Sequence, residues 1–204
     1  MPIAAKLVQA ALDEWERWGF STVPVHGKKA IGGTETKAPY VTFVNSYWKT
    51  VGQPTWNGNT KQPWSAAFIS FCFSKGQAAN AFPYASGHVG YCKAFVRNPG
   101  KYPGLRFGDP GVETLALGDL VFAGRSGDQC AAPPSTHAQA LAEIGSKTGW
   151  FCSHADSVVA GRPGEVDVIG GNVSDSVTMT TYVTTQNRIT DSRHNWLGVI
   201  KNTI

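Results

Sequence analysis

A serine stands in the first turn of an expected helix, where its hydroxyl could act as a nucleophile. The segment from Gln62 to Cys72 opens with Pro63 and Trp64, places Ser65 next, and continues with apolar residues at helical spacing. Unpaired backbone N–H groups at a helix start favour negative charge developing on an attacked carbonyl group. A serine at this position is more often only a helix cap, so its chemistry depends on partners elsewhere in the chain.

A general base for this serine is expected from His154, at the beginning of a strand-like run from Ser153 to Val159. Side chains alternate along a strand, so His154 and Asp156 are expected on the same face. The simplest alternative is that both face solvent and have no catalytic role. The functional interpretation is that His154 removes the proton from Ser65, as imidazoles do in many hydrolases.

An acceptor that orients the imidazole is expected from Asn172, which follows Gly170 and Gly171 at the end of the next strand. Its amide oxygen could hold the ring as in a Cys-His-Asn arrangement, although Gly-Gly-Asn is also an ordinary hairpin turn. Asp156 is the second candidate, but residues two apart on a strand are separated by about 6.5–7 Å at the backbone. We therefore rank Asn172 above Asp156, and give Asp156 a role at the rim of the site or in stabilising the imidazolium of His154.

Three further side chains are candidates for substrate contact: Trp64, His88 and Tyr91. His88 follows Gly87 at an expected helix start, where it could reach the groove or only cap a loop. The backbone N–H of Ser65 is the expected first donor to the oxyanion, and the sequence does not identify a second one.

The four cysteines do not offer a better nucleophile or a metal site. Cys72 lies about two turns beyond Ser65 among apolar neighbours, as expected for a buried, unreactive thiol, and Cys92 is expected in the core as well. Cys130 and Cys152 flank a loop-rich segment and could pair in an oxidising compartment, which the sequence leaves open. Without ligand spacing among His, Cys and carboxylates, we expect no metal and no cofactor.

The elements that must position these residues are helices first and strands afterwards. Helical periodicity predicts helices near 3–18, 44–51, 65–75 and 89–96, a surface loop over 20–39, and a short helix over 138–144. Strands are expected at 119–122, 155–160, 166–169, 177–183 and 196–200. This order predicts an α+β fold with N-terminal helices packed on an antiparallel β-sheet. We expect one domain over 1–204, with a helical extension over 1–60 and a catalytic core over 61–204.

Composition narrows the class of protein. With 204 residues, 42% hydrophobic and 16% charged, the chain can bury the core of one globular domain. The net charge of +4 is scattered, with Lys28-Lys29 as the only adjacent basic pair, so no nucleic-acid stripe is expected. Mild positive charge would favour approach to an anionic polymer such as a bacterial cell wall. No stretch is long enough to span a bilayer, and residues 1–18 do not resemble a signal peptide, so export by a dedicated machine is expected.

The order of the motifs resembles that of NlpC-type and CHAP-type amidases and peptidases. Those families carry Pro-Trp-Cys-Ala-Ala-Phe-Val at the nucleophile helix, then a Gly-Asp-hydrophobic strand, a Gly-His strand and a Gly-Asn turn. The corresponding residues here are Pro63–Ser70, Leu117–Phe122, His154 and Ile169–Asn172. Further segments resemble a bacterial branch of the superfamily that has serine in the nucleophile place. These segments are Glu14-Trp15, Tyr47-Trp48 and the stretch from Phe82 through His88 to Tyr91. With them, the similarity covers nearly the whole chain.

The resemblance implies a papain-like fold and hydrolysis of an amide bond in peptidoglycan peptides. Ser65 replaces the usual cysteine, which leaves three explanations: a true Ser-His-Asn/Asp hydrolase, a binding domain without catalysis, or a cysteine replaced for structural reasons. We expect the first, with peptidoglycan as substrate, in a secreted antibacterial effector with a cognate immunity protein or in a phage lytic protein. The alternatives are a non-catalytic cell-wall or protein-binding module and an acyltransferase or esterase.

Overall fold

The computed structural model describes residues 1–127 and 130–204 and has an α+β fold, as the sequence predicts. Its helices are α1 (Ile3–Arg17), α2 (Tyr40–Thr50), α3 (Ser65–Lys75), α4 (His88–Arg97) and α5 (His137–Gly145), with a short 3₁₀ helix at Ala79–Ala81. Its strands are β1 (Ser21–Val23), β2 (Leu105–Gly108), β3 (Leu120–Gly124), β4 (Ser153–Arg162), β5 (Glu165–Val173), β6 (Ser176–Thr185), β7 (Arg188–Ile189) and β8 (Asn195–Asn202).

The strands form one mostly antiparallel sheet in the order β1-β6-β5-β4-β3-β8-β2, and β7 pairs with β6. Only β1 runs parallel to its neighbour, β6, among the pairings of the described residues. In the register of β3 with β4, Ala123 lies opposite His154 and Val121 opposite Asp156. The central strand β4 therefore carries both polar side chains at the end where β3 finishes.

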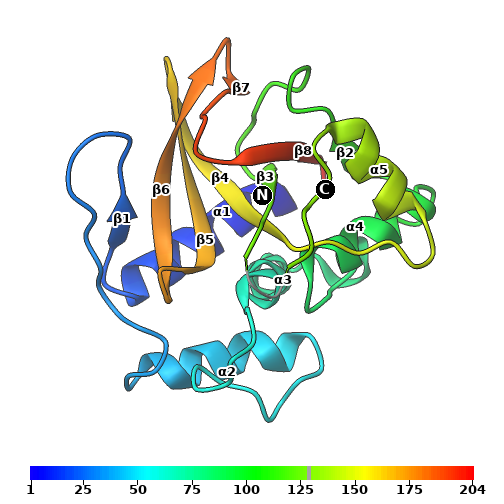
Figure 1. Cartoon of the computed structure of the whole chain (residues 1–204). Coiled ribbons are helices and arrows are strands. Elements are labelled where there is room, and N and C mark those ends of the chain that lie inside the picture. The colour runs from blue at the N-terminus through cyan, green and yellow to red at the C-terminus, as the bar shows by residue number, and fades with distance from the viewer. Residues whose placement is uncertain (128–129) are drawn as a thin grey trace.

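Helix α3 is enclosed by the rest of the fold from Ser65 to Phe73, because apolar residues lie on most of its sides. Ala66, Ala67, Phe68 and Ile69 are all buried, and so are Ser65 and Ser70. Helix α3 packs on β4 and β5, with α1 beside it and α2 on its outer side (Figure 1). The first residue of α3 is thus held against the sheet by a helix that packs on β4, β5, α1 and α2.

Alternation along the strands divides the apolar residues between the two faces of the sheet. Ile169 on β5 belongs to the large core shared with the helices, whereas its neighbour Val168 belongs to a smaller cluster with Val121, Val158 and Val199. The sheet is therefore buried on both sides over its central strands.

Short strands were the part of the fold that periodicity did not predict. We expected a loop over 20–39, but residues 21–23 form β1, which is fixed by pairing with β6 and by a hydrogen bond of 2.8 Å between the hydroxyls of Ser21 and Ser176. Strand β2 was not expected either, and it is held by β8. The proposed boundary between 1–60 and 61–204 stays a prediction, although α1 packs directly on α3, β4, β5 and β6.

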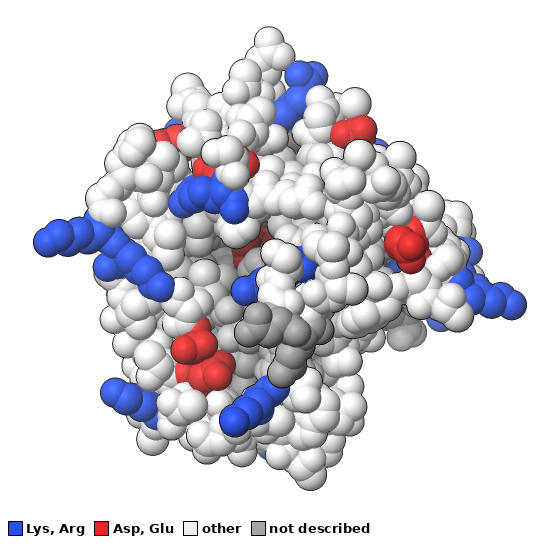
Figure 2. Space-filling model, viewed as in Figure 1, with Lys and Arg blue, Asp and Glu red and all other residues white. Residues whose placement is uncertain are grey.

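Charged side chains are dispersed over the surface. On the face shown in Figure 2, lysines and arginines are scattered, with a few acidic groups among them, and do not gather in a stripe. Within residues 1–127 and 130–204, no helix combines the length and apolarity that crossing a bilayer requires.

Candidate functional site

The hydroxyl of Ser65 is hydrogen-bonded to an imidazole, and the imidazole is that of His88. Ser65 Oγ lies 2.7 Å from His88 Nε2, and His88 Nδ1 lies 2.5 Å from the hydroxyl of Tyr91. Ser65 is the first residue of α3 and His88 the first residue of α4, so two helix N-termini meet at this bond. The three side chains are buried, which fixes their geometry.

A second imidazole is paired with a carboxylate on β4. His154 Nε2 donates to Asp156 Oδ1 at 2.6 Å, with side-chain exposures of 13% and 4%. The rotamers of this strand therefore allow the direct contact that spacing alone left uncertain. The other ring nitrogen, His154 Nδ1, is buried and has no hydrogen-bond partner among the described residues. Buried polar atoms without a protein partner are uncommon, so this nitrogen is free to bond to water or to a bound group.

The two imidazoles are neighbours. The ring centroids of His88 and His154 are 5.6 Å apart, with their planes inclined by 67°. Ser65 on α3, His88 on α4 and His154 on β4 thus bring a hydroxyl and two rings together from three separate elements.

Electrostatics keep His88 uncharged at neutral pH. Burial lowers the pKa of His88 well below 6.5, and the charges of His154 and Arg125 act in the same direction. The positive end of α4 also disfavours a proton on its first residue. Burial raises the pKa of Tyr91 well above 10, with smaller contributions from Cys92 and Asp156. Ser65 therefore faces a neutral imidazole, the form that can accept its proton.

Two glycines on β5 explain how these groups approach so closely. A Cβ at Gly170 would lie 1.7 Å from Asp156 Oδ1, so the carboxylate occupies the space of a side chain. A Cβ at Gly171 would lie 2.5 Å from Phe68 Cβ and 2.7 Å from the Trp64 ring. Gly170 makes room for the pair of His154 with Asp156, and Gly171 lets α3 pack tightly on the sheet.

The site opens into a hollow of about 600 Å³ whose lining includes Ser65, His88, Arg125, Trp150 and Asn172. A smaller hollow of about 190 Å³ contains His154 and Asp156 and shares Arg125 and Asn172 with the first. The reactive groups thus line two adjoining hollows. Arg125 and Asn172 stand where the two meet.

The structure changes the roles of several residues chosen from the sequence. The acceptor for His154 is Asp156 and not Asn172, so the ranking of these two is reversed. Asn172 adopts a left-handed backbone with φ 59° and lines both hollows. The expected bond between Ser65 and His154 is not formed, because the Ser65 hydroxyl is taken by His88. The role of His154 as base for Ser65 stays a prediction.

Two of the side chains that the sequence suggests as substrate contacts, Trp64 and Tyr91, are enclosed in the protein interior. Trp64 is fully buried, stacks on Trp18 at 5.3 Å and donates from its indole nitrogen to Glu35. Tyr91 is fully buried behind His88. Both were proposed to touch substrate, and both are packing or positioning residues in this fold.

Sequence reasoning missed the pairing of Ser65 with His88 and the parts played by Arg125 and Trp150. The indole of Trp150 is 62% exposed and lines the same hollow as Ser65. The spacing of His88 and Tyr91, three residues apart in one helix, was a usable signal because such residues share a helix face. No local pattern marked Arg125 or Trp150, which reach the site from loops.

Cys130 and Cys152 form a disulfide across the loop that contains α5. Both cysteines line the hollow at Ser65, so the bond forms part of its wall. Cys72 and Cys92 are free and buried, as expected for core residues.

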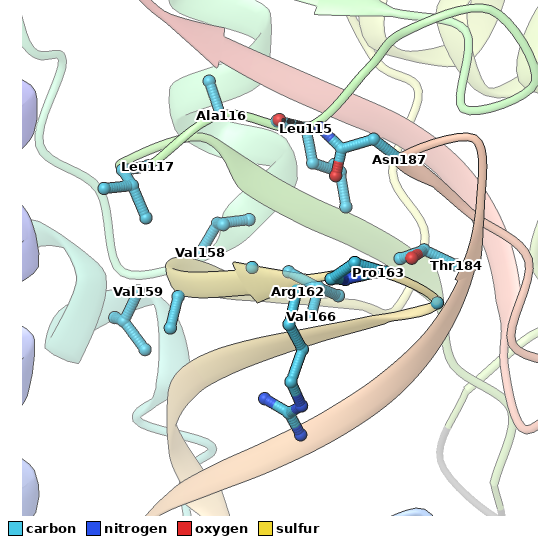
Figure 3. Close-up of a pocket in the computed structure, with 13 residues that line it drawn as sticks. Leu115, Ala116, Leu117, Val158, Val159, Arg162, Pro163, Val166, Thr184 and Asn187 are labelled. Carbon is cyan, nitrogen blue, oxygen red and sulfur yellow. Dashed lines mark hydrogen bonds between the residues drawn. The ribbon is translucent and has the colours of Figure 1, made fainter.

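A third hollow, of about 650 Å³, lies at the far end of the β4–β5 hairpin and holds none of the candidate catalytic residues. Figure 3 shows Arg162 and Pro163 at this hairpin and Leu115 and Leu117 on the facing segment. Asn187 donates to the carbonyl of Leu115 at 2.7 Å and closes one side. Its lining is mainly apolar.

In the described part of the chain, no group of three or more His, Cys, Asp or Glu side chains is placed to hold a metal ion.

Comparison with known proteins assigns a family to this arrangement. Residues 33–202 match the family model described as "Uncharacterized protein conserved in bacteria (DUF2272)". The chain belongs to this family. Ser65, His88, His154 and Asp156 all lie within the matched range. No match was found among curated proteins or among solved structures.

Proposed function

We propose that this DUF2272 protein is a serine-dependent amidohydrolase or peptidase of papain-like fold that cleaves an amide bond in bacterial cell-wall peptides. The observation that carries the proposal is the hydrogen bond of 2.7 Å between Ser65 Oγ and the ring of His88, at the start of a buried helix and open to a hollow. A hydroxyl hydrogen-bonded to a neutral imidazole is the minimal couple for nucleophilic catalysis.

The chemistry proceeds through an acyl-enzyme. Ser65 Oγ attacks the amide carbonyl while an imidazole takes its proton, and the oxyanion is met by the backbone N–H of Ser65 at the N-terminus of α3. Collapse of the tetrahedral intermediate expels the amine, and water then releases the acyl group. The pair of His154 and Asp156 supplies the second proton-handling group beside the nucleophile.

The cell-wall substrate is supported by the order of motifs shared with NlpC-type and CHAP-type enzymes and by the net charge of +4. Delivery by a secretion machine, and protection of the producing cell by an immunity protein, belong to the same proposal. The pairing of Cys130 with Cys152 fits an oxidising compartment such as the periplasm.

The test is digestion of purified peptidoglycan followed by separation of the products. We expect the wild type to release new amino groups, and we expect S65A to lower the rate by a factor of about 10³ or more. S86A is the matched control, because Ser86 is an exposed serine that lines the same hollow.

The other functions considered for this chain give different results in that assay. Intact wall peptides after incubation with wild type at catalytic concentrations would contradict the proposal. If S65A retained the full biological effect, the chain would be a binding module. Turnover of activated esters with no cleavage of wall peptides would indicate an esterase or acyltransferase.

A further inference from the structure

The site contains one nucleophile but two histidines with different partners. His88 contacts the Ser65 hydroxyl and is backed by a phenol, whereas His154 is backed by a carboxylate and keeps an unpartnered buried nitrogen. In hydrolases that use a single histidine, that ring must serve first as base and then as acid. With two adjoining rings, one can act as the base and the other can protonate the leaving group.

We infer that the two histidines divide the proton transfers: His88 is the general base for Ser65, and His154, held by Asp156, is the general acid that protonates the leaving amine. This inference rests on the proposed hydrolase function. It reverses the role that the sequence indicated for His154 and turns His88 from a substrate contact into a catalytic residue.

The steps balance without any further reactant. The proposed cycle starts from the form in which His88 carries its proton on Nδ1, which donates to the Tyr91 oxygen, and His154 carries a proton on each nitrogen. As Ser65 Oγ bonds to the amide carbon, its proton moves to His88 Nε2. The carbon–nitrogen bond then breaks, and His154 Nδ1 gives its proton to the departing amine. The acyl-enzyme is left beside protonated His88 and neutral His154.

Deacylation returns both protons. Water attacks the ester carbon while His154 Nδ1 takes one of its protons, and the bond from Ser65 Oγ to carbon breaks as His88 Nε2 returns a proton to that oxygen. Amide and water have become acid and amine, and each ring is back in its starting form.

The hydrogen-bond partners of the two rings determine which ring is the base and which is the acid. Rings whose centroids are 5.6 Å apart repel each other when both are charged, which favours a resting site with a charge on only one of them. A carboxylate stabilises a charged imidazole more than a phenol does, and His154 is the ring that is hydrogen-bonded to a carboxylate. When environments separate two titratable groups in this way, the group that stays neutral is the base and the one that keeps its proton is the acid.

The lowered pKa of His88 agrees with this assignment. The direct contact of Ser65 with His88, and its absence with His154 among the described hydrogen bonds, agrees as well. The geometry therefore favours His88 over His154 as the group that activates the nucleophile.

The test compares a leaving group that needs a proton with one that does not. The 4-nitrophenolate released from 4-nitrophenyl acetate departs without an acid, whereas the amine released from peptidoglycan requires one. With the acetate we measure the burst of 4-nitrophenol and the acetylation of Ser65 by intact mass. With peptidoglycan we measure the release of amino groups.

We expect H154Q to keep the ester burst within about tenfold of wild type while its amide cleavage falls by about 100-fold or more. We expect H88Q to lose both by about 100-fold or more, since the nucleophile is no longer activated. H88N serves as a second variant, and melting temperatures show that each variant is folded.

Loss of the ester burst in H154Q together with its retention in H88Q would overturn the division of roles and leave the hydrolase intact. A wild type that shows neither ester burst nor amide cleavage would overturn the hydrolase function itself.

The dependence of the two reaction rates on pH provides a second measurement. The rate of amide cleavage by wild type should fall on both sides of an optimum, and the rate of the ester burst should fall only on the acid side.

Discussion

The protonation state of His88 connects the chemistry of the site to the stability of the fold. Its ring is buried, and among the described residues its two nitrogens are hydrogen-bonded to the hydroxyls of Ser65 and Tyr91, neither of which carries a charge. Under the proposed function, a neutral imidazole in this place is ready to accept the proton of Ser65. The same environment penalises a proton that arrives from bulk solvent.

We predict that the free energy of unfolding falls as the pH decreases below about 6.5, and falls more steeply in wild type than in H88Q. The folded-state pKa of His88 lies below its ordinary value, so between the two values the unfolded chain binds a proton that the folded chain does not. Proton uptake by the unfolded state favours unfolding, and stability is therefore full above the ordinary value and lost below it. Urea denaturation at a series of pH values measures the difference.

Exposed His26 provides the control for that comparison. H26Q removes an imidazole from the surface, and we expect its pH dependence to follow wild type. Parallel curves for wild type and H88Q would contradict the assignment of a buried neutral ring.

At the scale of elements, the approach of α3 to β5 sets the position of Ser65. We predict that G171A destabilises the protein by about 1–3 kcal/mol, because a methyl group would overlap Phe68 and the Trp64 ring. G161A is the matched control, since a Cβ at Gly161 meets nothing within 4 Å. Denaturant midpoints of both variants test the prediction, and equal midpoints would show that α3 can move away from the sheet.

The elements also show what the sequence could and could not predict. The first helix was predictable because an amphipathic helix repeats its buried residues at helical spacing over several turns, as Leu7, Ala11 and Trp18 do at the start of the chain. Strand β1 was not, because three residues carry no period and depend on a partner strand far away in sequence.

The same contrast holds for the candidate site. The position of His154 at the start of β4, on the same strand face as Asp156, followed from alternation. The preference for Asn172 over Asp156 was wrong, because strand spacing says nothing about rotamers or about the space that Gly170 leaves free. The pairing of Ser65 with His88 depends on how α4 packs near α3, which no local pattern encodes.

At the scale of the whole molecule, the disulfide ties the loop around α5 to the wall of the hollow at Ser65. Cys130 and Cys152 are separated by 22 residues, and the segment between them packs on α4 and β8 through α5. Closing a loop of this length restricts the unfolded chain and stabilises the folded one by about 3 kcal/mol.

We predict that reduction lowers the free energy of unfolding by about 3 kcal/mol, measured by denaturation with and without a thiol reductant. The C130A/C152A double variant is the control and should be insensitive to reductant, since Cys72 and Cys92 are free in either condition. An equal effect of reductant on this variant would assign the loss to another cause.

The order in which the chain is synthesised determines when each side chain of the candidate site becomes available. Ser65 and His88 are separated by 23 residues and emerge from the ribosome early, while β4 with His154 and Asp156 follows only after α5 has been made. Under the division of roles inferred above, the chain has no donor for the departing amine until β4 has been made. Amide-cleaving capacity would then appear only near the end of translation, when the last strands close the sheet.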